Sequence, residues 1–277
     1  LEDINYTEYD KFGNVVAQDI TTYTDELSSA FKDYKEVTNT YKDDVSRKRG
    51  NAEVSTVSRW LDASKADTAW IDKTVTTTTE FDDQGRAVVQ TQDVYVYKTS
   101  LQPAFHNEIT NLNYNNRGDA GEQHITSYKV VEGANVLADY KVLTNRSYDA
   151  SHNITNQMIL TYSDSSSAAP LDVQETRSIG FTSTGVALQQ IIGTYSDAEK
   201  TSQIGVKVID NSDISQSGNV GLRVITNYST VVFKDGDSSK EILSYSGSLD
   251  RQTITIASDD FDNRGSATHQ TVLSEGV

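Results

Sequence analysis

The sequence predicts an all-β fold: an antiparallel meander of about eight two-strand repeats of ~33 residues each, forming a curved, spiralled or tubular β-sheet. Three observations predict it. A motif in which an aromatic residue is followed four positions later by glycine recurs along the 277 residues. Thr, Ser, Val, Ile and Tyr dominate the composition, and they favour half-buried strands. With only 2 Pro in the chain, few N–H donors are missing from strand ladders.

The motif fixes the register of the predicted copies. Copies begin at an anchor, aromatic in most cases, near residues 9, 45, 81, 114, 148, 181, 214 and 261. In most copies glycine follows four residues after the anchor, glutamine nine and tyrosine fourteen. The residues to which we assign this repeat-structural role are Gly13, Gly85, Gly118, Gly185, Gly218 and Gly265; Gln18, Gln90, Gln123, Gln157, Gln190 and Gln270; and Tyr23, Tyr95, Tyr128, Tyr162, Tyr195 and Tyr228.

Exceptions to the three series fall in a few copies. In the second copy Gly50, Ser55 and Trp60 stand one residue late. In the fifth copy His152 occupies the glycine position, and in the seventh Arg223 replaces glutamine. Agreement at the remaining positions is too regular for chance, so the sequence predicts an internal repeat.

Local chemistry explains the motif, as the stretch from Phe81 to Tyr95 illustrates. Asp82 is suited to capping a turn, and Gly85 to the positive φ of a hairpin bulge. About ten residues of strand propensity follow, and their side chains alternate between the two faces of a sheet. One face carries the glutamine, while the other ends in the tyrosine.

The second half of each copy is predicted to be a return strand, which runs antiparallel to the outgoing strand and leads to the next anchor. The chain opens on a return strand at 1–9 and closes on an outgoing strand at 266–274. Alternation predicts further return strands in "NEITNLNY" (107–114), "DYKVLTNRSY" (139–148) and "VKVIDNSDI" (206–214). We therefore expect about 16 strands, joined by tight glycine turns at one end and longer loops at the other.

Four of the longer loops, at 23–31, 60–70, 162–170 and 195–202, begin alike. Each has an Asp two residues after an aromatic residue, which we expect to cap a single helical turn. The seventh copy is the longest, and its extra residues 229–246 predict an added hairpin around "KDGDSS".

A single repeat array over 1–277 is expected, because no change in composition marks a linker. The sequence starts and stops in the middle of the pattern and lacks an initiator Met, which suggests a fragment of a longer chain.

Charge and composition exclude several classes of function. The net charge of -16 disfavours nucleic acid as a partner, because it repels phosphate backbones. The absence of Cys excludes disulfides and thiolate chemistry. No apolar run approaches the ~18 residues of a membrane helix, which argues against a membrane partner. The hydrophobic share of 36% and the mean hydropathy of -0.54 predict a thin core.

The motif resembles the YD repeats of the Rhs family and of long repeat arrays in giant bacterial surface proteins. The resemblance rests on "YDKFGN" (9–14), on Phe81-Asp82 with Gly85, and on Phe261-Asp262 with Gly265. Such families build curved or tubular β-sheets from successive hairpins, and some enclose a toxin. The period here is longer, and the outgoing strand carries Gln and Ile in place of a second glycine signal. The resemblance implies an extracellular or cell-surface location.

No constellation in the sequence indicates an enzyme or a cofactor. The four His residues match no metal-ligand spacing. In "DGDSSKE" (235–241), Lys240 stands at the sixth position, where a calcium loop has glycine, and the terminal Glu of such a loop is missing. We therefore expect no cofactor, and the alternative is that Asp-rich turns bind Ca²⁺ weakly. The residues of these turns are Asp82 and Asp83, and Asp259, Asp260 and Asp262. We found no P-loop, dinucleotide fingerprint or nucleophile elbow.

Three functional hypotheses remain. The first is a non-enzymatic structural repeat module of a large bacterial extracellular or cell-surface protein, acting as a stalk, tube or adhesive scaffold. Its partners are neighbouring repeats of the same chain. The second is a glycan- or protein-binding module, in which the Gln and Tyr rows contact a cell-surface partner instead of lining a polar interior or packing across strands. The third is an outer-membrane β-barrel.

Overall fold

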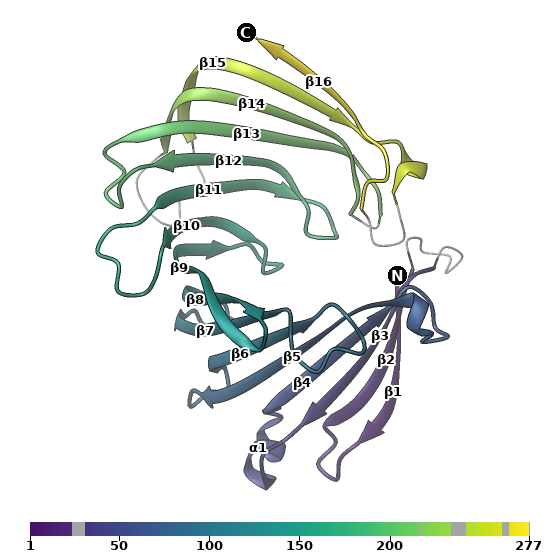
Figure 1. The fold of residues 1–277 in the computed structure, drawn as a ribbon. Helices are drawn as coiled ribbons and strands as arrows, with labels where there is room; N and C mark the ends of the chain where they lie inside the picture. Colours follow the sequence, from purple (N-terminus) through teal and green to yellow (C-terminus); the bar gives the residue numbers. More distant parts are fainter. Residues whose placement is uncertain (24–30, 217, 234–241, 262–265, 277) are drawn as a thin grey trace. The chain divides into compact units, whose positions relative to one another are not determined.

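The computed structural model describes residues 1–23, 31–216, 218–233, 242–261 and 266–276. These residues form an all-β meander in which each of 16 strands is the neighbour of the strand that follows it in sequence (Figure 1). Neighbouring strands pair in antiparallel fashion, as β11 and β12 do where Ser178 lies opposite Gln190. The predicted fold class is therefore confirmed.

The strands have the following bounds in chain order. They are β1 (Glu2–Tyr9), β2 (Val15–Tyr23), β3 (Phe31–Thr40), β4 (Val54–Trp60), β5 (Trp70–Phe81), β6 (Ala87–Tyr95), β7 (Phe105–Tyr114), β8 (Ala120–Val131), β9 (Ala134–Tyr148), β10 (Ile154–Tyr162), β11 (Asp172–Phe181), β12 (Ala187–Tyr195), β13 (Gln203–Ile214), β14 (Val220–Phe233), β15 (Ile242–Thr255) and β16 (Thr271–Gly276). The described helical elements are α1 (Asp44–Arg49) and the 3-10 turns η1 (Asp67–Ala69) and η2 (Ser258–Asp260), none of which has the length and apolar character needed to cross a bilayer.

Helix α1 explains why the second copy of the motif runs one residue late. The carboxylate of Asp43 accepts the N–H of Ser46 and begins the helix. The helix ends at Gly50, which has a φ of +73° and whose N–H donates to the carbonyl oxygen of Arg47. This short helix takes the place of the tight turn found in six other described hairpins, and it needs one more residue.

The loop at 60–70 contains the single 3-10 turn η1, but Asp62 does not cap it as expected, because its N-cap is Ala66 and has no side-chain cap. Asp62 and Asp164 each accept the N–H of the residue two positions later, Ser64 and Ser166, at 2.9 and 2.8 Å. That is the pattern of an Asx turn, because the acceptor closes a ring with the second residue along rather than beginning a helix. The corresponding residues at 24–30 lie outside the described part of the chain.

The seventh and eighth copies depart from the expected strand limits. Residues 229–233 and 242–246 continue β14 and β15, and they pair at Thr230 with Ser246 and at Val231 with Tyr245. The tip of this predicted extra hairpin, 234–241, lies outside the described residues. The last strand begins at Thr271, later than predicted.

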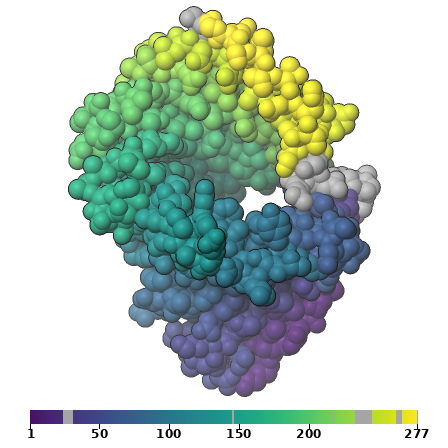
Figure 2. All heavy atoms as spheres, in the orientation of Figure 1, coloured from purple at the N-terminus to yellow at the C-terminus, as the bar shows by residue number. Residues whose placement is uncertain are grey.

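Contacts between Cα atoms divide the chain into two compact units. Unit 1 comprises Leu1–Asn111 and His124–Asp139, and unit 2 comprises Leu112–Gln123 and Tyr140–Val277. Figure 2 shows atoms of successive strands of unit 2 as adjoining bands of teal, green and yellow.

The core of unit 1 is a small aromatic cluster. Tyr34, Trp60 and Ala69 are buried, and Phe31 and Trp70 pack against them. The rings of Trp60 and Trp70 meet edge to face, with centroids 5.3 Å apart and planes at 83°. Aromatic rings bury a large area each, which suits a sheet with few apolar residues.

The core of unit 2 consists of two clusters built from alternate residues of neighbouring strands. One comprises Met158, Leu160, Val173 and Tyr195, and the other comprises Ile191, Val206, Val208 and Val231. Val173 and Ile191 are fully buried. The spacing of two within β10 and β13 places these side chains on one face of each strand. The clusters are small, in keeping with the thin core expected from composition.

Candidate functional site

The turn between β5 and β6 shows the frame that most of the hairpin turns share. The N–H of Asp82 donates to the carbonyl oxygen of Arg86 at 2.9 Å, and the N–H of Gly85 donates to that of Asp82 at 3.0 Å. A carboxylate oxygen of Asp82 accepts the N–H groups of Gln84 and Arg86 at 2.9 and 2.8 Å. Gly85 has a φ of +81°, the left-handed region that side chains disfavour. This is the turn with a glycine bulge that Asp-x-x-Gly predicts.

Five other described turns have the same frame. In each, the residue after the anchor donates its N–H to the carbonyl oxygen four residues later, at 2.9 to 3.0 Å. The residues after the anchors are Asp10, Asn115, Asp149, Thr182 and Ser215, and the left-handed positions are held by Gly13, Gly118, His152, Gly185 and Gly218. The φ of His152 is +64°, so it takes the place of glycine in its turn. Gly265 lies outside the described residues.

The turn carboxylates are most effective as acceptors when they are charged. The backbone N–H of Arg86, assisted by its side-chain Nε at 2.6 Å, lowers the pKa of Asp82 below its usual value. The pKa of Asp164 is lowered in the same direction, mainly by the hydroxyl and N–H of Ser166. The hydrogen bonds to these carboxylates are therefore strongest at neutral pH. They weaken when acid protonates the carboxylates.

Successive turns touch each other within each unit. A Cβ built on Gly85 would lie 2.8 Å from the amide oxygen of Asn51, and one on Gly185 would lie 3.0 Å from that of Asn153. In unit 2, Nδ1 of His152 lies 2.5 Å from a carboxylate oxygen of Asp119. The residue after one left-handed position thus packs against the left-handed position of the next turn.

The glutamines of the repeated series lie in strands, with one exception. Five of them are half-buried; Gln270 is exposed and precedes β16, so it is not part of the predicted strand row. Gln18 lies in β2, Gln90 in β6, Gln123 in β8, Gln157 in β10 and Gln190 in β12.

In unit 2, Gln157 and Gln190 line a cavity of about 510 Å³ that crosses β10 to β14. We call it the Gln groove. Its other polar lining residues are His152, Asn153, Thr176, Ser178, Asn211 and Arg223, and Phe181 supplies an aromatic ring. The side chains come from five successive strands and two turns. The pairing of these strands therefore brings the lining residues together.

Side-chain hydrogen bonds hold most of the Gln groove in place. Nε2 of Gln190 donates to Oγ of Ser178 at 3.2 Å, and Nε of Arg223 donates to Oδ1 of Asn211 at 3.0 Å. The side-chain oxygen of Gln157 is buried and accepts no hydrogen bond from the described residues. An unsatisfied buried acceptor is costly, so a rotation of the amide that brings this oxygen to a ligand hydroxyl in the groove would be favourable.

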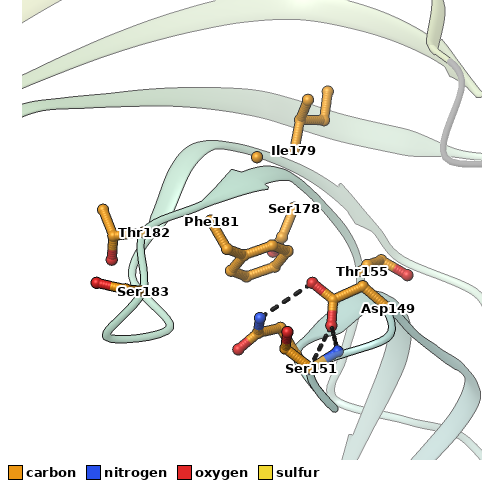
Figure 3. A pocket seen from close by; sticks show the side chains of 10 residues that line it. Asp149, Ser151, Thr155, Ser178, Ile179, Phe181, Thr182 and Ser183 are labelled. Carbon is orange, nitrogen blue, oxygen red and sulfur yellow. Dashed lines mark hydrogen bonds between the residues drawn. The ribbon is translucent and has the colours of Figure 1, made fainter.

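A second cavity of about 550 Å³ adjoins the Gln groove and shares Asn153, Ser178 and Phe181 with it. Figure 3 shows the ring of Phe181 directed toward the turn that holds Asp149 and Ser151, while Ile179 points away. Asp149 accepts the side-chain Nδ2 of Asn153 at 3.0 Å. Phe181 therefore lies where the two cavities meet.

The corresponding part of unit 1 is arranged differently. A smaller cavity of about 230 Å³ lies beside Phe81 and includes Glu53 and Arg49. There Gln90 donates from Nε2 to the hydroxyl of Thr78 at 3.1 Å, and its oxygen accepts Nδ2 of Asn111 at 3.2 Å. Both ends of this amide are satisfied within the protein, in contrast to Gln157.

Within its own strand, each tyrosine of the series lies on the face opposite the glutamine position, and most of these tyrosines pack across strands. Ring centroids are 6.3 Å apart for Tyr23 and Phe31, 5.8 Å for Tyr128 and His106, 5.9 Å for Tyr162 and Tyr140, and 4.6 Å for Tyr228 and Tyr245. Nζ of Lys73 lies 3.9 Å from the centroid of Tyr95. Tyr195 is buried, and burial raises the pKa of its hydroxyl.

A buried ion cluster accompanies the apolar residues on this face of unit 2. Glu175 and Arg177 are 3% and 2% exposed, and Arg177 Nη2 lies 2.7 Å from Glu175 Oε1. Lys200, from the loop after β12, reaches the other carboxylate oxygen at 2.6 Å. In unit 1, Lys65 extends from the loop after β4 and lies 3.0 Å from Glu36.

The candidate metal-binding residues are not gathered into a site. Within the described ranges, no group of three or more His, Asp or Glu side chains is placed to hold a metal ion. His106 contacts Asp93 at 2.7 Å, and Asp82 uses its carboxylate within its own turn. Asp262 lies outside the described residues, so Ca²⁺ binding at the Asp259–Asp260 turn stays a prediction.

Three asparagines play a part that the sequence analysis missed. Asn39, Asn111 and Asn211 donate from Nδ2 to the carbonyl oxygens of Val15, Ala87 and Ala187, at 3.1, 3.1 and 2.9 Å. Each carbonyl lies six residues after an anchor. Asn111 and Asn211 each precede the next anchor by three residues, a spacing that could have revealed two members of this row.

Comparison with known proteins adds no family to these observations. No protein-family model matches the sequence, and no curated protein matches it. The resemblance to YD repeats therefore remains a prediction from the motif.

Proposed function

We propose that the chain is a non-enzymatic structural module of a large bacterial protein at the cell surface or in the extracellular space. Successive hairpins would act as repeats of a stalk, tube or adhesive scaffold. The observation that supports this proposal best is the contact of each turn with a turn about one copy away. Such contacts stabilise a structure through its nearest neighbours, without a single thick core.

Polar contacts between neighbouring copies follow the period of the motif. Lys11 reaches Asp44 at 3.1 Å, Lys35 reaches Glu2 at 3.0 Å, and His152 reaches Asp119 at 2.5 Å; each pair is 33 residues apart. The first two pairs lie in unit 1 and the third lies in unit 2. The principal partners of each hairpin in this proposal are thus the neighbouring hairpins of the same chain.

Deletion of one whole copy tests the proposal. Removing 182–214 joins Phe181 directly to Ser215, so an anchor is again followed by a turn residue. We expect the shortened protein to keep its β-sheet circular dichroism and a cooperative urea transition at a lower midpoint. A matched deletion of equal length that cuts through two copies, 198–230, should unfold unit 2. Complete loss of β structure after the first deletion would refute an additive array.

A further inference from the structure

The Gln groove differs in charge from the rest of this acidic chain. None of its lining residues is Asp or Glu, although the chain has 40 Asp and Glu against 24 Lys and Arg. The adjoining cavity includes Asp149, the one beside Phe81 includes Glu53, and a cavity near the first turn includes Glu8 and Asp10. An anionic group is therefore repelled less by the lining of the Gln groove than by the linings of these three cavities.

Arg223 supplies a positive charge at this place. It stands where most copies have glutamine, and its side chain is exposed. Its Nε is held by Asn211, and no carboxylate among the described residues pairs with its guanidinium. The two Nη groups are donors in a fixed fork, a geometry that matches a carboxylate.

The remaining groups suit a ligand with many hydroxyls. The amides of Gln157 and Gln190 offer both donors and acceptors, and the buried oxygen of Gln157 lacks a donor from the described protein. The ring of Phe181 offers an apolar surface beside them. Gln157, Gln190 and Arg223 lie on β10, β12 and β14, so successive members are at least about 10 Å apart across the sheet. That interval exceeds the length of one monosaccharide, so it suits a sugar chain in which every second unit reaches one of these residues.

A peptide strand is a poorer fit. The strands beneath the groove are paired with neighbours on both sides, as the registers of β11 with β10 and with β12 show. Their backbone N–H and C=O groups are thus engaged in the ladder and cannot extend the sheet onto a peptide. Recognition must use the side chains, which are mostly amides and hydroxyls.

We infer that the Gln groove binds an acidic polysaccharide, with Arg223 holding a sugar carboxylate and Gln157 and Gln190 holding sugar hydroxyls. This goes beyond the scaffold role and does not depend on it. Isothermal titration calorimetry with oligogalacturonate and hyaluronan hexasaccharides tests the inference. Fully methyl-esterified oligogalacturonate serves as the neutral control ligand. We expect one or both acids to bind, and the ester to bind at least about 10-fold more weakly than its acid.

Two arginine variants make the test specific. R223Q installs the residue that most copies carry at this position, so it should fold normally and weaken binding of the acid by about 10-fold or more. R251Q changes an exposed arginine on β15 that does not line the groove, and it should bind within about two-fold of the unchanged protein. Circular dichroism checks the fold of both variants.

Three outcomes would overturn the inference. One is that neither acidic hexasaccharide binds, and another is that R223Q and the unchanged protein bind equally. The third is that a poly-glutamate peptide binds as tightly as the acidic sugars with the same dependence on Arg223. That last result would show a general carboxylate site rather than a glycan site.

Discussion

Gly13 and Gly85 hold the same position in two turns but differ in their surroundings. Both have a positive φ, +86° and +81°. A Cβ on Gly13 would meet nothing within 4 Å, whereas one on Gly85 would press on the amide of Asn51. Gly13 is thus required by backbone conformation alone, and Gly85 by conformation and by the neighbouring turn.

Alanine substitutions should separate these two costs. We expect Gly13→Ala to lower the free energy of unfolding by about 1–2 kcal/mol, and Gly85→Ala to lower it further, because Asn51 must move. Gly205, in β13, has open space and no positive φ, so Gly205→Ala should be neutral or slightly stabilising. Urea unfolding monitored by circular dichroism measures all three. Equal effects of the Gly13 and Gly85 changes would contradict contact between the turns.

Asp82 makes the stability of its turn depend on pH. Its pKa in the folded protein is lowered, so the stabilisation is fully present above the unfolded value of about 3.9 and is lost as pH falls through the folded pKa. Asp82→Asn keeps the acceptor oxygen, as Asn115 does in its own turn. We expect this variant to show a flatter fall of unfolding free energy between about pH 5 and 2. If the unfolding free energy of the variant fell as steeply in acid as that of the unchanged protein, the hydrogen bonds assigned to the Asp82 carboxylate would be contradicted.

The turn residues could be predicted from sequence because five adjacent residues determine each turn. Asp82 to Arg86 contain every donor and acceptor of their frame, and even the substitution of glycine by His152 is visible in the motif. The partner of Gly85 could not be predicted, because Asn51 is brought to it by the pairing of separate strands.

At the scale of elements, loops after two outgoing strands carry a lysine back onto the sheet. Lys65 lies over the rings of Tyr34 and Trp60, at 5.0 and 6.0 Å, and Lys200 reaches Glu175. Both lysines have a positive φ, +55° and +58°. The environments differ: Glu36 has an exposed side chain, whereas the side chain of Glu175 is 4% exposed.

Removal of the two lysine charges should therefore have different consequences. Lys200→Met takes one of two cations from a buried carboxylate, and we expect it to lower the free energy of unfolding by about 1–3 kcal/mol. Lys65→Met breaks an exposed pair and keeps the aliphatic chain over the rings, so its cost should stay below about 1 kcal/mol. Thermal and urea unfolding measure both. A larger loss of unfolding free energy for Lys65→Met than for Lys200→Met would contradict this difference between the exposed and the buried ion pair.

Strand order could be predicted, whereas the composition of the faces could not. Alternation and turn spacing are local signals, and they gave the meander of β1 to β16. Glu175 and Arg177 read in sequence as a polar strand face, yet they lie beside Met158 and Ile191 because of register. In the Gln groove, the motif places Arg223 in the same row as Gln157 and Gln190, whereas the contact of Arg223 with Asn211 depends on strand pairing.

At the scale of the whole molecule, burial is divided among small clusters. Unit 1 has the cluster around Trp60, and unit 2 has those around Val173 and Ile191. Because each cluster joins only a few successive strands, we expect stability to arise from contacts between neighbouring hairpins. A destabilising substitution in one hairpin should then lower the stability of the adjacent strands more than that of distant strands.

Amide hydrogen exchange of an Ile191→Ala variant tests this claim most directly. Ile191 is fully buried on β12, and its truncation should cost about 2–5 kcal/mol locally. Exchange followed by mass spectrometry should show protection lost chiefly in β11 to β14, with β1 to β3 unchanged. Gly205→Ala in the same region is the control and should leave the exchange pattern as it is. An equal loss of protection in every strand would contradict neighbour-coupled hairpins and indicate a single cooperative fold.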